Sequence, residues 1–290
     1  MDYEDEIKEL NKKVRRKNII SLTIIINVLI SIIIYLILNN FYMFLPFAIM
    51  SISIVGIIVT SIINTSDNLR IHSLFKENIV KKVLNDNFTD AVLYDYGMDE
   101  KTVEETGMIN TRDRYNSNDL LIAKYKNVPF KMSDIIIQEE DTDSDGNTSY
   151  HTVFRGQYII FNCKNNFKTN IEVCSKNFSV ARRVTNYKTV RFEDVEFDKM
   201  FYTAALNEID AFYLFTPPFM EKIKELNNKY GSIMIFFLNN EMHMLIDSGN
   251  DLFNLYRIKN FDSIKETKRI EEEIKFIKDI VDSLELGGKN

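Results

Sequence analysis

The stretch IISLTIIINVLISIIIYLILNNFYMFLPFAIMSISIVGIIVTSII, residues 19–63, decides the fold of the N-terminal part of the chain. It holds two apolar runs, Ile19–Leu38 and Met43–Ile63, and no charged side chain. A helix needs about 20 residues to cross the ~30 Å hydrocarbon core of a bilayer, so each run is long enough to span it. The connection at residues 39–42 is so short that the second helix must return at once. Residues 19–63 therefore predict a transmembrane helical hairpin.

Basic residues flank both ends of this hairpin and predict its orientation. They are Lys12, Lys13, Arg15, Arg16 and Lys17 before the first run, and Arg70, Lys76, Lys81 and Lys82 after the second. The connecting turn is uncharged, so the positive-inside rule places both termini in the cytoplasm. The first run is too long for the apolar region of a cleaved signal peptide, and a second span follows it directly. The many Asn, Ile and Lys residues suggest an AT-rich bacterial genome, so we expect a bacterial cell-membrane protein with two spans.

The rest of the chain predicts two further parts. Residues 1–18 form a charged, mobile cytoplasmic segment, and residues 64–290 form a cytoplasmic domain of about 225 residues, enough for a real core. Thr65–Asn87 is expected to be helical. Strand-like runs follow at Ala91–Tyr96, Leu120–Tyr125, Val128–Gln138, Val153–Asn162 and Asn170–Cys174. Strands followed by helices without strict alternation favour an α+β domain with a mostly antiparallel sheet.

Turns and helix ends complete this picture. Lys126-Asn127 and Asn239-Asn240 are typical of tight turns between paired strands. Glu193–Phe201 is expected to be a short helix, and Thr216-Pro217-Pro218 is expected to begin another. A long amphipathic C-terminal helix is predicted over Ser263–Leu284. Its apolar residues at helical spacing are Ile270, Ile274, Ile277, Val281 and Leu284.

Three ordered motifs in Val153–Leu226 resemble a known family. They are Phe154-Arg155-Gly156 before an aromatic strand, the run Val190–Phe201, and the run Glu208–Pro217 followed by Phe219–Ile223. Together they resemble the bacterial domain-of-unknown-function family 3137. The resemblance implies an N-terminal two-helix membrane hairpin, a cytoplasmic domain and a LemA-type membrane protein as partner. The family has no established catalytic residues, so none are transferred to this chain.

The motifs that could carry chemistry favour structural interpretations. Asp141–Gly146 copies the start of a calcium loop, but Thr152 stands where a bidentate Glu is needed and the flanks look like strands, so a solvated loop is expected. The acids of residues 193–198 are interpreted as a solvated helix start. His72, His151 and His243 are scattered, and Cys163 and Cys174 are expected to be buried free thiols. No metal site, cofactor or catalytic residue is predicted.

A basic segment between residues 164 and 191 is the candidate contact site. Its members are Lys164, Lys168, Lys176, Arg182, Arg183, Lys188 and Arg191, and Glu172 is the only acid among them. The whole chain has a net charge of −6, so this segment stands out. Basic residues near an anionic leaflet contribute about 1 kcal/mol each. The alternative is a solvated ribbon that pairs with acids at Glu139–Asp145 or Glu193–Asp198. Nucleic-acid binding is disfavoured because no aromatic stacking platform is recognisable.

These observations lead to one leading functional hypothesis and one alternative. The leading hypothesis is a noncatalytic, membrane-anchored interaction module that docks a protein partner or the anionic membrane surface. The alternative is a membrane-tethered enzyme or small-ligand-binding domain without a recognisable motif. The absence of charge within the two apolar runs argues against a pump or channel.

Overall fold

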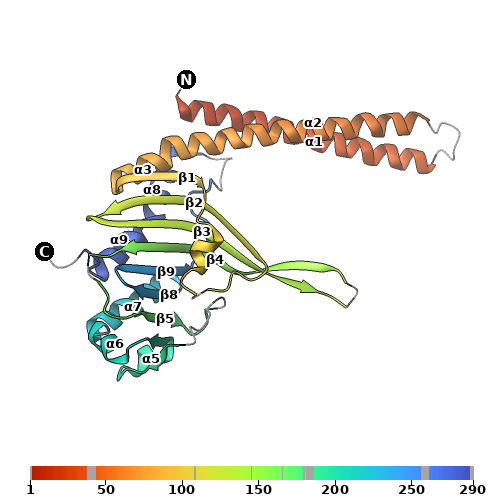
Figure 1. Cartoon of the computed structure of the whole chain (residues 1–290). Helices are drawn as coiled ribbons and strands as arrows, with labels where there is room; N and C mark the ends of the chain where they lie inside the picture. Colours follow the sequence, from red (N-terminus) through yellow and green to blue (C-terminus); the bar gives the residue numbers. More distant parts are fainter. Residues whose placement is uncertain are drawn as a thin grey trace. The chain divides into compact units, whose positions relative to one another are not determined.

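The computed structural model describes residues 2–37, 44–107, 109–144, 146–164, 166–178, 180, 186–255 and 261–287 (Figure 1). The chain divides into two compact units. The first unit comprises Met1–Lys82 and Asn254–Lys268, and the second comprises Val83–Phe253 and Arg269–Asn290. Each unit is described by itself.

Two long helices dominate the first unit, α1 (Tyr3–Ile37) and α2 (Phe44–Phe75). They run antiparallel, because Glu6 accepts a hydrogen bond from Arg70 at 3.0 Å and Lys17 forms an ion pair with Asp67. Farther along the pair, beyond the Lys17–Asp67 contact, the helices approach closely: a Cβ on Gly56 would lie 3.3 Å from the Cδ1 atom of Ile24. A small residue at such a crossing lets two helices pack backbone to backbone.

The charged N-terminal segment, which was expected to be mobile, is helical. Residues 3–18 form the first turns of α1. Acids stand in its first turn, where the helix dipole favours them. Glu4 pairs with Lys8 at 3.5 Å and Glu9 with Lys13 at 3.1 Å, both at the i,i+4 spacing that supports a helix.

One helix among the described residues is long and apolar enough to cross a membrane, over Tyr3–Ile33 in α1. Such a helix near the N-terminus is typical of a membrane anchor or a signal sequence. Large apolar side chains along it are exposed, among them Ile19, Leu22, Leu29 and Ile33. The predicted connection at residues 39–42 lies outside the described residues. In α2 the described side chains are those of residues 51, 53–56, 58 and 65–75, so two spans are not shown.

The segment after the second apolar run is helical, as predicted, but it is not one regular helix. α2 ends at Phe75, a π-helical turn η1 occupies Lys76–Val80, and α3 covers Lys81–Asn87. Ile79, Val80, Val83 and Leu84 of this stretch are buried, whereas Leu69 is exposed. Their packing follows the amphipathic pattern of the sequence.

The second unit is built on a nine-stranded antiparallel sheet, which confirms the α+β class (Figure 1). The strand order is β1-β2-β3-β4-β9-β8-β5-β7-β6. The strands are β1 (Thr89–Tyr96), β2 (Arg114–Tyr125), β3 (Val128–Thr142), β4 (Thr148–Asn162), β5 (Ile171–Ser175), β6 (Lys188–Val190), β7 (Phe201–Ala205), β8 (Ser232–Leu238) and β9 (Glu241–Asp247). Both predicted tight turns are confirmed, with positive φ at Lys126, Asn127 and Asn239. The short strands β6 and β7 were not predicted from the sequence.

Gly156 explains one of the family motifs. It lies in β4 opposite Ile135, and β4 also pairs with β9. A Cβ at this position would lie 1.9 Å from the carbonyl oxygen of Ile246. Only glycine fits so close an approach of two backbones.

Six helices of the described chain accompany the sheet: α4 (Glu100–Glu104), α5 (Val195–Met200), α6 (Glu208–Leu214), α7 (Pro217–Tyr230), α8 (Ser263–Glu273) and α9 (Lys275–Ser283). The predicted long C-terminal helix is therefore two helices. The break falls at Ile274, whose φ and ψ are −86° and −4°. The apolar stripe from Ile270 to Leu284 is buried as predicted, because both helices present it to the core.

The cysteines behave as predicted, as buried free thiols. Cys163 follows β4, and burial raises the pKa of its thiol to about 12. Cys174 lies in β5, which pairs with β7 and β8. The strands β4 and β5 are not neighbours in the sheet.

A candidate anion-binding cleft at the end of the sheet

The structure brings two residues of the predicted basic segment together. Lys176 directly follows β5, and Arg191 directly follows β6. Both line a cleft of about 520 Å³ near β6, β7 and α5. Lys164, Lys168 and Lys188 are described but do not line it, and Arg182 and Arg183 lie outside the described residues.

The cleft has a mixed lining. Its cations are Lys176, Arg191 and Lys199, and its carboxylate is Asp198. Three hydroxyl-bearing residues (Thr189, Tyr202 and Thr203) and four apolar residues (Val190, Phe192, Val195 and Phe201) complete it. Three cations against one carboxylate make the cleft suited to an anion.

Helix α5, which contributes Val195, Asp198 and Lys199 to the lining, is short and capped. Asp194 accepts hydrogen bonds from the backbone N–H groups of Glu196 at 3.0 Å and Phe197 at 2.9 Å, which begins the helix. The Phe197 hydrogen bond, with the nearby Lys224, lowers the pKa of Asp194. The helix ends after Met200 and the chain enters β7 at once.

Asp198 connects segments of the chain that line the cleft. Its Oδ1 atom accepts a hydrogen bond from the backbone N–H of Phe192 at 3.2 Å, so the chain after β6 is held against α5. Its backbone carbonyl accepts a hydrogen bond from Nζ of Lys176. The carboxylate and the carbonyl of one residue therefore fix two of the surrounding segments.

Asp194 and Glu196, which are close in sequence to the lining residues, form ion pairs with Lys224, a cation that does not line the cleft. The buried Lys224 of α7 lies 3.3 Å from Asp194, 3.0 Å from Glu196 and 2.8 Å from Glu221. The alternative interpretation of the basic segment named Glu193–Asp198 as one of its two possible sets of counterions. Two of those acids have Lys224 as their partner instead.

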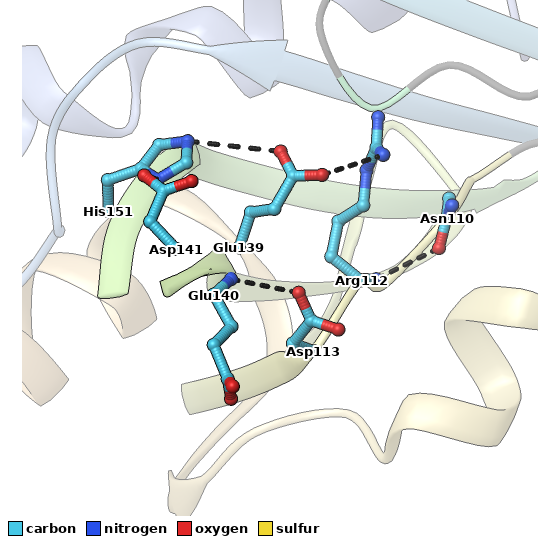
Figure 2. Close-up of polar contacts among 7 residues, drawn as sticks. All are labelled: Asn110, Arg112, Asp113, Glu139, Glu140, Asp141 and His151. Atoms are coloured by element: carbon cyan, nitrogen blue, oxygen red, sulfur yellow. Dashed lines mark hydrogen bonds and ion pairs between the residues drawn. The ribbon is translucent and has the colours of Figure 1, made fainter. Parts of the chain in front are cut away.

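The acidic loop that the same alternative invoked also has local partners (Figure 2). Glu139 lies 3.3 Å from Arg112, and Asp141 lies 2.8 Å from Nδ1 of His151. The hydroxyl of Tyr150 donates to Glu140 at 2.8 Å. Glu139, Glu140 and Asp141 belong to the long β3–β4 hairpin, which extends beyond the sheet in Figure 1.

The tip of this hairpin is a loop between strands, as predicted, and is not flanked by helices. Asp143 accepts hydrogen bonds from the backbone and side-chain amides of Asn147 at 2.8 and 3.0 Å. Gly146 has a φ of +82°, which suits a turn. Thr152 belongs to β4, so the missing calcium ligand is a strand residue.

Two cations of the cleft are accessible and unpaired. Arg191 and Lys199 are exposed, and neither makes a hydrogen bond or ion pair with any residue that the structure describes. Thr203 is 3% exposed, and its hydroxyl has no hydrogen-bond partner within the described part of the chain. Lys199 and Thr203 were not predicted from the sequence, because Lys199 follows an acidic run and Thr203 is distinguished only by its burial.

An exposed apolar surface on α6 adjoins the cleft. Ile209 is 65% exposed and Tyr213 is 75% exposed, and Phe212 is also exposed. The ring of Phe212 contacts the ring of Phe192, a lining residue, at 5.5 Å between centroids. The spacing of these three residues at i, i+3 and i+4 was the available sequence signal. Lys168 lies 5.9 Å from the Tyr213 ring, which brings another basic-segment residue to this surface.

A second cluster, Asp119, Asp134 and Asp251, has the geometry of a metal site. One carboxylate oxygen from each lies within 4.8 Å of the others. Within the described residues no such group includes a histidine or cysteine. Both oxygens of Asp134 already accept hydrogen bonds, from Nε2 of Gln157 and from the backbone N–H of Leu252, each at 2.8 Å.

Burial explains the electrostatics of this cluster. It raises the pKa of Asp134 well above its ordinary value, and the nearby charge of Asp251 raises it further. A protonated Asp134 can share its proton with a neighbouring carboxylate. The occupied oxygens and the raised pKa favour a structural, proton-sharing role over a metal site.

Comparisons with known proteins give a family for part of the chain. No curated protein matches the chain. A solved structure, described as the crystal structure of the mycobacterial trehalose monomycolate transport factor A, TtfA, is similar with 6% sequence identity and a TM-score of 0.41. The similarity covers 72% of this chain and 94% of that chain. The model of family DUF3137, described as a protein of unknown function, matches residues 152–286, so the predicted resemblance to this family is confirmed over that part of the chain.

Proposed function

We propose that the chain is a membrane-anchored, noncatalytic module that docks its sheet domain on an anionic membrane surface. The observation that carries this proposal is the pairing of accessible cations with exposed apolar side chains in one region. Arg191 and Lys199 are unpaired in the described structure, and Ile209 and Tyr213 are exposed on the neighbouring α6. Basic groups beside apolar side chains are typical of surfaces that bind at the lipid headgroup level.

The proposed anchor is the two-helix hairpin with both termini in the cytoplasm. The exposed apolar residues Ile54, Val55 and Ile58 of α2 support a second span beside that of α1. Large exposed apolar patches mark membrane or protein contacts. The lipid bilayer is then the first partner of the chain.

The energies explain why an anchor is needed. Three cations near an anionic surface contribute on the order of 3 kcal/mol, at about 1 kcal/mol each. A dissociation constant of about 1 mM already requires roughly 4 kcal/mol. Such a surface binds weakly when free, but a tether raises its effective concentration to the millimolar range. The apolar side chains of α6 add to the docking energy.

A tryptophan reporter tests this proposal, because the chain has no Trp. The full-length Tyr213→Trp variant would be reconstituted in nanodiscs of phosphatidylcholine alone or with phosphatidylglycerol. We expect a blue-shifted emission and quenching by brominated lipid in the anionic nanodiscs only. The matched control is Tyr96→Trp on β1, where Tyr96 is 61% exposed. β1 is one edge strand of the sheet, whereas α6 contacts β6 and β7 at the other edge.

The outcomes separate the candidate partners. Quenching that is absent, or equal in neutral and anionic nanodiscs, would contradict docking on an anionic surface. The LemA-type partner implied by the family resemblance stays a prediction. It would gain support if the reporter responded only after a LemA-type protein was added to the nanodiscs.

A further inference from the structure

We propose that the cleft lined by Lys176, Arg191 and Lys199 is a binding site for a phosphate ester of a small polyol, such as a glycerophosphate group. This inference rests on the proposed function, because the headgroup of an anionic phospholipid carries this chemistry. A soluble phosphate ester carries it too.

The three cations approach the cleft from separate parts of the fold. Lys176 follows β5, Arg191 follows β6 and Lys199 lies in α5. Lys176 is positioned by its hydrogen bond to the carbonyl of Asp198. Arg191 presents a planar fork that can bind two phosphate oxygens, whereas lysines act as point charges. One arginine and two lysines suit a compact, multiply charged oxyanion.

A hydroxyl group gives independent support for a ligand. Thr203 lines the cleft and is 3% exposed, and its hydroxyl has no partner among the residues described. Buried polar groups in proteins are nearly always hydrogen-bonded, and an unsatisfied one destabilises the structure. A phosphate oxygen, reached by rotation of the threonine side chain, would supply the missing partner.

The remaining lining indicates an organic phosphate over a bare ion. The volume of about 520 Å³ falls in the range of small-molecule sites and exceeds what one phosphate group fills. Val195 and Phe201 offer apolar contacts to a carbon skeleton. One oxygen of Asp198 accepts from Phe192, and its other oxygen can accept a ligand hydroxyl. A carboxylate in a cationic cleft is therefore useful for a polyol.

Calorimetric titration of the full-length protein in detergent tests this inference. The probes are glycerol 3-phosphate, the soluble diester glycerophosphoglycerol, and inorganic phosphate. We expect saturable binding of at least one ester, tighter than binding of inorganic phosphate. Arg191→Gln should weaken ester binding roughly 10-fold or more, since it removes a charge-assisted hydrogen bond. Thr203→Val keeps the side-chain shape and should weaken it by roughly 5-fold.

The matched control is Lys188→Gln, which removes an exposed cation of β6 that does not line the cleft. It should leave ester binding unchanged within about 2-fold, whereas a charge-only surface would respond alike to Lys188→Gln and Arg191→Gln. Equal losses in these two variants, no loss in Thr203→Val, or inorganic phosphate binding as tightly as both esters would each overturn the inference.

Two further results separate the ligand source and the parent proposal. Binding of the diester identifies a lipid headgroup as the source, and binding of the monoester alone identifies a soluble phosphate ester. If titration fails while the Tyr213→Trp reporter still responds to anionic nanodiscs, the phosphate site is excluded and membrane docking stands. If titration succeeds and the reporter is silent, the site stands without docking.

Discussion

The cleft near α5 and the aspartate cluster near β2 and β3 differ in the exposure and pairing of their charged side chains. In the cleft, Arg191 and Lys199 are exposed and have no partner within the described structure. In the cluster, Asp119 and Asp134 are 1% and 2% exposed, and the oxygens of Asp134 accept hydrogen bonds from Gln157 and Leu252. Both regions hold three like-charged side chains, so clustering alone does not mark a binding site.

The difference lies in what the surroundings do with the charge. Burial of a carboxylate raises its pKa, and the group can remain neutral and serve as a hydrogen-bonding element of the core. A guanidinium or an exposed ammonium keeps its charge and stays available to a ligand. The comparison therefore predicts that the cluster stabilises the fold and that the cleft does not.

The largest expected effect is on stability at the aspartate cluster. Asp134→Ala leaves the backbone N–H of Leu252 without its acceptor and deprives Gln157 of one. We expect the free energy of unfolding to fall by about 2–3 kcal/mol. Urea titration in detergent, followed by circular dichroism, measures it. Asp134→Asn retains one acceptor, so its free energy of unfolding should fall by less than that of Asp134→Ala. Equal stability of the wild-type and alanine proteins would remove the structural assignment.

The second prediction concerns pH at the same residue. The folded-state pKa of Asp134 lies above its ordinary value, so the folded state holds a proton that the unfolded state has released. The stabilisation by Asp134 is complete below the unfolded pKa of about 3.9 and is lost as pH rises through the folded pKa. Within that window the slope can reach about 1.4 kcal/mol per pH unit.

The nontitrating Asp134→Asn variant isolates this dependence from that of other groups. The stability difference between wild type and variant should favour wild type most near pH 4 and shrink toward pH 8. Urea titrations at several pH values would measure both proteins. A difference that stays constant over this range would show that Asp134 does not titrate between the two states.

Much of the sheet domain could be predicted from local sequence patterns. Aromatic and branched runs identified β1 to β5, and the Asn and Lys turns set two hairpins. The strands β6 (Lys188–Val190) and β7 (Phe201–Ala205) were missed, since three to five residues carry little periodicity. The single helix predicted over Ser263–Leu284 breaks at Ile274 without a Pro or Gly to mark it. The apolar stripe was nevertheless correct.

The candidate site was predictable only in part. Lys176 and Arg191 belong to a segment with unusual local charge, which can be read directly from the sequence. Their meeting with Lys199 and Thr203 depends on the pairing of β5, β6 and β7, which no local pattern reveals. The aspartate cluster was missed for the same reason. Asp119, Asp134 and Asp251 are distant in sequence, and β2–β3 pairing brings only the first two close.

The smallest expected effect is on stability at the cleft, where ligand binding should change most. The double variant Arg191→Gln with Lys199→Gln should alter the free energy of unfolding by less than about 0.5 kcal/mol. A slight gain is expected, because removal of two like charges relieves repulsion. Lys224→Gln is the matched control: Lys224 is buried among three carboxylates, so its loss should lower stability clearly. Urea titrations of the wild type, the double variant and Lys224→Gln measure the two changes in the free energy of unfolding. If the double variant lost as much stability as Lys224→Gln, the cleft cations would be structural, and the contrast between a ligand surface and a structural cluster would fail.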